Sequence, residues 1–184
     1  MELEIRPIRQ DEYQRTHAFQ CEYLDAESFQ DFARRIEANP DLYLVAFYDD
    51  ELVGICYGHP SEKDTAAISL QGIAVNLDEK KGYARVGIGS KMMRVFESTV
   101  RRRGYKKIGV GSADNQKVEH FYLKNEFKPC ELVAKGSLYR ELDRVKIDDY
   151  ELGKAKQQEL RQKYDAIEVI FIFEKSIDDI NRIY

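Results

Sequence analysis

The sequence has few cysteines, no long apolar run and no excess of positive charge, and each shortage excludes a class of protein. Its three cysteines, Cys21, Cys56 and Cys130, are far apart and form no CxxC pair. This spacing argues against a zinc site and against a disulfide framework. We therefore expect no bound metal and a reducing compartment, the cytoplasm.

The longest apolar run, AIEVIFIF at 166–173, has the length of a strand rather than of a membrane span. The opening decapeptide MELEIRPIRQ is charged from its second residue and has no apolar core of the kind found in signal peptides. We expect no membrane partner and no secretion.

The charge balance is mildly acidic, with 29 Lys+Arg against 33 Asp+Glu and a net charge of −4. Nucleic-acid binding requires a basic face, so we expect no nucleic-acid partner. With 43% hydrophobic and 34% charged residues, the 184-residue chain is typical of a globular protein. We expect one domain over 1–184, because the chain has no repeat and no linker rich in Gly, Ser or Pro.

Hydrophobic periodicity predicts an alternation of strands and helices. A strand at 3–8, interrupted by Pro7 and so placed at an edge, precedes one or two helices within 11–38. Three strands follow at 42–48, 52–58 and 65–76; a helix then begins near Ile88 and ends before Gly104. Strands at 106–112, 127–136 and 166–174 alternate with a short helix capped by Asp114 or Asn115 and a polar helix at 148–164. The polar helix has a thin apolar stripe formed by Leu152, Ala155 and Leu160.

This order predicts an α/β fold with a mixed, mostly antiparallel central sheet flanked by helices, and an extra helix before the last strand.

The glycine-rich stretch GYARVGIGSKMM, 82–93, resembles two nucleotide-binding motifs and matches neither. A P-loop requires lysine where Ile88 stands, and a dinucleotide fingerprint requires glycine where Met92 stands. What remains is a loop and a helix start with free N–H groups, near Lys80, Lys81 and Lys91. The stretch either holds a pyrophosphate or merely turns the chain.

Three spaced motifs resemble the GNAT superfamily of N-acetyltransferases. The first is Ile73-Ala74-Val75 at the end of a central strand, and the second is Gly87-Ile88-Gly89-Ser90, which fits the end of the family's [Q/R]xxGx[G/A] loop. The third is Asn115 followed by the segment 122–127, YLKNEF, where the family has Tyr-x-Lys-x-Gly-Phe. The resemblance runs from residue 3 to Phe127 and implies acetyl-CoA as cosubstrate.

The resemblance also implies a role for each matched residue. Tyr122 would be the catalytic acid that protonates the departing thiolate of coenzyme A, although a packing aromatic is the ordinary role of such a tyrosine. Asn115 would hold the pantetheine arm or cap its helix. The residues implied to bind the cofactor are Ile73, Ala74, Val75, Arg85, Val86, Gly87, Ile88, Gly89, Ser90 and Asn115.

The chain departs from the family pattern at several positions. Ala84 stands where the family has Arg or Gln, with Arg85 one place later. Ser69, Gln71 and Val110 stand where relatives carry a general-base carboxylate, so the sequence names no base. Four other carboxylates are conceivable bases but more typical of a solvated surface: Glu22, Glu62, Asp64 and Glu131. Glu126 replaces the family's glycine, and we expect Asn125 to adopt the left-handed conformation instead.

The predicted function is acetyl transfer from acetyl-CoA to a primary amine, by direct attack in a ternary complex. The amine, a small molecule or a peptide, would enter beside the first helices, where Glu22, Asp25 and Glu27 favour a cationic acceptor as much as a solvated helix face. The sequence leaves a monomer or a homodimer open. Two alternatives stay open, an acyl-CoA sensor without turnover and an interaction domain without cofactor.

Overall fold

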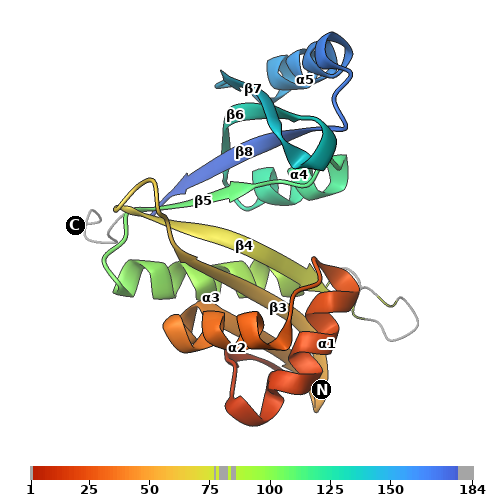
Figure 1. The fold of residues 1–184 in the computed structure, drawn as a ribbon. Helices are drawn as coiled ribbons and strands as arrows, with labels where there is room; N and C mark the ends of the chain where they lie inside the picture. Colours follow the sequence, from red (N-terminus) through yellow and green to blue (C-terminus); the bar gives the residue numbers. More distant parts are fainter. Residues whose placement is uncertain (1, 77, 79–82, 84–85, 178–184) are drawn as a thin grey trace, which may run out of the picture. The chain divides into compact units, whose positions relative to one another are not determined.

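The computed structural model describes every residue except 1, 77, 79–82, 84–85 and 178–184. The described residues fall into two compact units, residues 2–106 with Ile177 and residues 107–176 (Figure 1). Among them no helix is long and apolar enough to cross a membrane. The expectation of a single domain stays a prediction.

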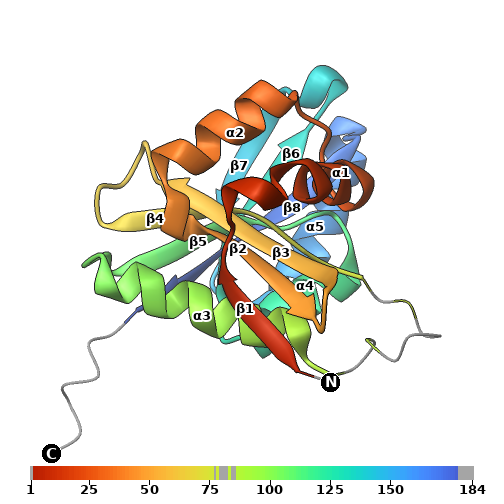
Figure 2. The same cartoon turned by 90° about the horizontal axis from the view of Figure 1, so that it is seen from below.

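The first unit is an antiparallel sheet in the order β1-β2-β3-β4. Its strands are β1 (Leu3–Pro7), β2 (Tyr43–Tyr48), β3 (Glu51–Pro60) and β4 (Ala67–Val75). Its helices are α1 (Tyr13–Tyr23), α2 (Phe29–Ala38) and α3 (Ile88–Arg102). As Figure 2 shows, α1 and α2 cover one face of this sheet and α3 covers the other.

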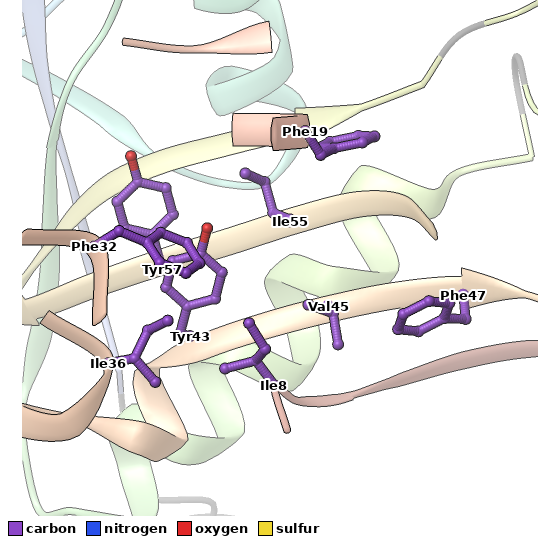
Figure 3. Close-up of a cluster of buried hydrophobic side chains, with 9 residues drawn as sticks. All are labelled: Ile8, Phe19, Phe32, Ile36, Tyr43, Val45, Phe47, Ile55 and Tyr57. Atoms are coloured by element: carbon purple, nitrogen blue, oxygen red, sulfur yellow. The ribbon is translucent and has the colours of Figure 1, made fainter. Parts of the chain in front are cut away.

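The face under α1 and α2 is an aromatic core (Figure 3). The rings of Tyr43 and Tyr57 stack with centroids 4.8 Å apart, and Phe32 of α2 meets Tyr43 edge-on at 5.4 Å. Ile36 follows Phe32 by one helical turn and is equally buried. The four-residue separation of Phe32 and Ile36 is part of the periodicity that predicted α2, since residues four apart lie on one helical face.

The second unit is also an antiparallel sheet, in the order β5-β8-β6-β7. Its strands are β5 (Lys107–Gly111), β6 (Lys128–Lys135), β7 (Glu141–Lys146) and β8 (Glu168–Ser176), and its helices are α4 (Gln116–Lys124) and α5 (Tyr150–Tyr164). The two units confirm the mixed α/β class with mostly antiparallel strands, and α5 is the predicted extra helix before the last strand.

Two expectations about this second unit were wrong. The sequence analysis missed β7, because ELDRVK is mainly charged and half-exposed, as suits a strand that pairs only with β6 among the described residues. The buried face of α5 is also not the apolar stripe. Leu152 is 71% exposed and Ala155 is exposed, whereas Gly153, Gln157 and Leu160 are buried.

A buried carboxylate ties the start of α1 to β1. Glu12 accepts two hydrogen bonds from Arg6, at 2.9 and 2.6 Å, and one from the Arg9 backbone N–H at 2.9 Å. The bonds from Arg6 lower the pKa of Glu12 to about 2 against the opposing effect of burial, and Arg9 and Arg15 add to the lowering. The folded state therefore favours the charged carboxylate.

We predict that Glu12→Gln lowers the free energy of unfolding by about 2 kcal/mol at pH 7, the scale of hydrogen bonds to a charged group. Because the folded pKa is depressed, the stabilisation is fully present above the ordinary pKa of 4.5 and is lost as pH falls toward 2. Denaturant unfolding from pH 7 to pH 2 should show the difference between variant and parent shrinking below pH 4.5. Glu4→Gln is the control, since Glu4 is 54% exposed. A difference that stays constant over this range would contradict the assignment.

Candidate functional site

The amino end of α3 is open to an anion. Its N-cap is Gly87, in the left-handed conformation with φ +74°, and neither a capping side-chain bond nor an acidic residue occupies the first turn. The first N–H to reach a helical carbonyl is that of Lys91, which donates to Gly87 at 2.9 Å. By helix geometry the N–H groups of Ile88, Gly89 and Ser90 have no acceptor within the helix.

Gly87 leaves room for a ligand beside these amides. A Cβ built on Gly87 would meet nothing within 4 Å, so no described atom covers that side of the helix end. Positive φ also makes glycine the natural residue here. The helix dipole favours negative charge at the same place.

The loop before α3 is anchored by an interaction that the sequence analysis did not find. The Tyr83 hydroxyl donates to Glu51 Oε2 at 2.6 Å, and its ring lies 5.5 Å from that of Tyr48. Tyr83 is 9% exposed although Lys80, Lys81 and Arg85 lie within three residues of it in the sequence. An aromatic residue inside a charged loop was the available signal. Arg85, by contrast, lies outside the described residues, and Val86 is 40% exposed.

Ile73, Ala74 and Val75 form the end of β4, as predicted. They pair with Cys56, Ile55 and Gly54 of β3 on one edge, and all three are partly exposed. Just before them, Leu24 and Tyr57 crowd the space in which a Cβ of Gly72 would lie. Leu24, which directly follows α1, therefore packs against β4 just before this end of the strand.

Asn115 caps α4, so of the two predicted caps it is the one used. Its Oδ1 accepts from the backbone N–H of Lys117 at 2.9 Å and of Val118 at 3.4 Å. Asn115 is exposed, and its amide nitrogen has no hydrogen-bond partner among the described residues. The same side chain can therefore cap the helix and donate to a ligand.

Tyr122 lies near the other end of α4, within an aromatic cluster. Its ring centroid is 5.4 Å from those of Phe121 and Phe127 and 5.7 Å from that of Phe173. It is 4% exposed, so its ring is held by packing on three sides. Asn115 and Tyr122 thus share one short helix, seven residues apart.

Comparison with known proteins shows to which protein family the chain belongs. The model of the acetyltransferase (GNAT) family matches residues 3–127, about two thirds of the chain. The chain belongs to the GNAT family. No curated protein sequence matches it.

Solved structures of low sequence identity share the fold. Ard1 from Thermoplasma volcanium is 15% identical with a TM-score of 0.68, over 97% of this chain and 100% of that one. An N-acetyltransferase from Staphylococcus aureus Mu50 is 12% identical with a TM-score of 0.67, over 97% and 100%. Diaminobutyrate acetyltransferase from Paenibacillus lautus, solved with L-2,4-diaminobutyric acid and coenzyme A, is 15% identical with a TM-score of 0.66, over 98% and 99%.

None of the four carboxylates considered from the sequence is marked as a general base in the structure of this GNAT chain. Asp64 accepts the backbone N–H of Ala66 at 2.9 Å, and Glu131 is paired with Arg144. Glu22 and Glu62 are exposed. The described residues also contain no group of His, Cys, Asp and Glu able to hold a metal ion.

Of the three acidic residues that favoured a cationic acceptor, one is already occupied by contacts within the structure. Glu27 is paired with Arg35 at 2.6 Å and accepts a hydrogen bond from Gln20, which itself accepts one from Tyr43. Glu27 therefore links α1 to α2 through Gln20 and Arg35. Glu22 and Asp25 remain exposed on this segment.

The expectation for Asn125 was wrong. Asn125 has φ −91°, and Glu126, at the position of the GNAT glycine, takes the left-handed conformation with φ 68°. Asn125 instead donates its side-chain amide to the Phe121 carbonyl at 2.8 Å, which holds it in its helix-terminal conformation. Glu126 gains only a 3.5 Å contact with Lys175 while 85% exposed.

We predict that Glu126→Gly raises the free energy of unfolding by about 0.5–1 kcal/mol, because glycine adopts positive φ without the clash of a Cβ. Glu126→Ala is the matched control: it removes the same carboxylate but keeps the strain, so it should not stabilise. Denaturant unfolding of the three proteins measures the difference. Equal stabilities of the glycine and alanine variants would show that the backbone is not strained here.

Proposed function

We propose that this GNAT chain transfers the acetyl group of acetyl-CoA to a primary amine, by direct attack of the amine in a ternary complex. The observation that carries the proposal is the open amino end of α3, which follows β4 within the segment matched by the family model. The residues present fit a coenzyme A pyrophosphate. Three N–H groups are without a helical acceptor, and Gly87 leaves the space beside them open.

The backbone amides of Arg85, Val86, Gly87, Ile88, Gly89 and Ser90 would bind the pyrophosphate. Lys91, exposed in the first turn of α3, adds positive charge. Backbone groups of Ile73, Ala74 and Val75 would pair with the pantetheine arm, as if it were an added strand. The free amide nitrogen of Asn115 would donate to a carbonyl of the same arm.

Tyr122 would act as the general acid. When the amine nitrogen bonds to the thioester carbonyl and the carbon–sulfur bond breaks, the leaving thiolate must gain a proton. A phenol with an ordinary pKa of about 10 still carries its proton at pH 7 and can give it to the sulfur, whose thiol has a pKa near 8.5. The amine loses a proton in turn, either to water or before it binds, since no carboxylate stands at Ser69, Gln71 or Val110.

The acceptor would approach beside the segment between α1 and α2, where Leu24 and Tyr57 lie against Gly72. Exposed Glu22 and Asp25 favour a cationic amine there. A small amine bound together with coenzyme A in the diaminobutyrate acetyltransferase supports this class of acceptor. We also propose the cytoplasm as the compartment, because Cys21, Cys56 and Cys130 are free thiols.

A thiol-release assay tests the activity, with acetyl-CoA and a panel of diamines, amino acids and short peptides with free amino termini. We expect release of coenzyme A that depends on one class of amine. The missing base favours a second candidate, an acyl-CoA sensor. Binding of acetyl-CoA without turnover on any amine would support the sensor and contradict the enzyme.

We predict that Tyr122→Phe lowers kcat about 100-fold, the usual contribution of a general acid, and changes acetyl-CoA affinity less than about twofold. The ring and its aromatic contacts remain, and the substitution removes the hydroxyl that would donate the proton. Tyr139→Phe is the matched control, because Tyr139 is 71% exposed in the same unit and should leave kcat unchanged. Steady-state kinetics and calorimetric binding give the two quantities. An unchanged kcat in Tyr122→Phe would remove Tyr122 from the mechanism.

A further inference from the structure

Besides buried Gly153 and Leu160, helix α5 contacts its unit through a stripe of polar side chains. Tyr150, Lys154, Gln157 and Arg161 are spaced by four, three and four residues, so they lie on one face of the helix. All four make hydrogen bonds within the unit. This polar stripe, rather than the apolar stripe expected from the sequence, makes hydrogen bonds between α5 and the rest of the unit.

The first half of the stripe holds a buried carboxylate of α4. Glu119 Oε1 accepts hydrogen bonds from the Tyr150 hydroxyl at 3.0 Å and from Lys154 Nζ at 2.9 Å. The Glu119 side chain is 1% exposed, and its Oε2 has no partner among the described residues. A buried charge is costly unless a counter-charge lies beside it. The ammonium group that contacts Glu119 comes from α5.

The second half of the stripe holds the residue before α4. Arg161 binds both oxygens of Asp114, at 2.8 and 3.0 Å, and the backbone N–H of Val169 donates to Asp114 at 2.9 Å. Burial opposes the charged form, but these hydrogen bonds prevail and the pKa of Asp114 lies below its ordinary value. Gln157, fully buried, donates to the Val169 carbonyl at 2.7 Å and so fixes α5 against β8 as well.

Each of the two carboxylates held by α5 lies shortly before one of the residues proposed for the reaction. Asp114 immediately precedes Asn115, and Glu119 lies one turn before Tyr122. Helix α4 has only nine residues, and so short a helix is not stable alone. Its orientation must come from contacts outside itself, and those of Glu119 and of the preceding Asp114 include an ion pair each with α5. The family model ends at 127, so α5 lies beyond the segment it matches.

We propose that α5 is a brace for α4: by holding Asp114 and Glu119 it positions Asn115 and Tyr122 for acetyl transfer. Arg161 and Lys154 are therefore positioning residues that act through these carboxylates and touch no substrate. The positioning role rests on the proposed function, whereas the mechanical link between α5 and α4 does not.

The link is tested by backbone amide exchange in the full-length protein. In Arg161→Gln, the amides of residues 119–125 should exchange about tenfold faster than in the parent, because α4 opens more often. Arg161→Lys keeps one charged donor for Asp114 and should return most of the protection. Lys156→Met is the control, since Lys156 lies in α5 outside the polar stripe and forms an ion pair with Glu159 of the same helix.

The positioning role is tested by kinetics on the same proteins, with the best amine of the panel and the folded fraction measured by circular dichroism. We expect Arg161→Gln to lower kcat about tenfold, with the KM for the amine within twofold of the parent, because α4 carries no acceptor contact. A purely structural role would leave kcat per folded molecule unchanged. If Arg161→Gln does not fold, Glu119→Gln is measured instead. It keeps an acceptor for Tyr150 and should give the same pattern.

Faster exchange in α4 together with lower kcat supports the brace. Unchanged exchange, or faster exchange with unchanged kcat, overturns it. If the parent shows no turnover on any amine, the proposed function fails, and the exchange comparison alone decides whether α5 holds α4.

Discussion

The close contact of α3 with β3 is the constraint on which the first unit depends. A Cβ on Gly54 would lie 2.8 Å from the Met92 methyl carbon, and one on Gly58 would lie 3.0 Å from the Phe96 ring and closer still to the Ser69 carbonyl oxygen. Because both glycines lack side chains, the helix packs directly on the strand backbone. Met92 and Phe96 lie one and two turns after Ile88, so this contact also fixes where the open amino end of α3 lies.

The second unit also has a close contact, since a Cβ on Gly153 of α5 would lie 2.8 Å from the Phe171 ring, and it adds ion pairs between α5 and the α4 region. The short helix α4 packs Tyr122 against Phe127 and Phe173, and its Glu119 pairs with Lys154 of α5. Asp114, which precedes the helix, pairs with Arg161 of α5. Ion pairs of this kind depend strongly on geometry, because an unmatched buried carboxylate is costly. Apolar packing thus holds the amino end of α3, the proposed pyrophosphate site, whereas in the proposed brace charge pairing orients the helix that carries Tyr122.

Those parts of the fold that follow from a single local pattern, such as the limits of α3, could be predicted from the sequence. The 3.6-residue period placed α3 from Ile88, and Gly104, with φ +84°, ends it as expected. The predictions failed where local preferences compete with tertiary contacts. Glu126 takes the left-handed conformation because the amide of Asn125 is committed to the Phe121 carbonyl, and α5 buries Gln157 because Val169 offers it a carbonyl. The strand β7 is too charged to give a clear alternation of apolar and polar residues. No sequence pattern could specify that Asp114 and Glu119 meet residues of α5 more than thirty positions away.

The central claim is that the amino end of α3 binds the pyrophosphate of acetyl-CoA. Calorimetric titration with acetyl-CoA, with acetyl-dephospho-CoA, which keeps the pyrophosphate, and with S-acetylpantetheine, which carries the same thioester but lacks the pyrophosphate and the adenosine 3′-phosphate, tests it most directly. We predict that acetyl-CoA and acetyl-dephospho-CoA both bind at least about 100-fold more tightly than S-acetylpantetheine, because two or more charge-assisted hydrogen bonds are lost with the pyrophosphate. Equal affinity for acetyl-dephospho-CoA and S-acetylpantetheine, or no binding of acetyl-CoA at millimolar concentration, would contradict the account.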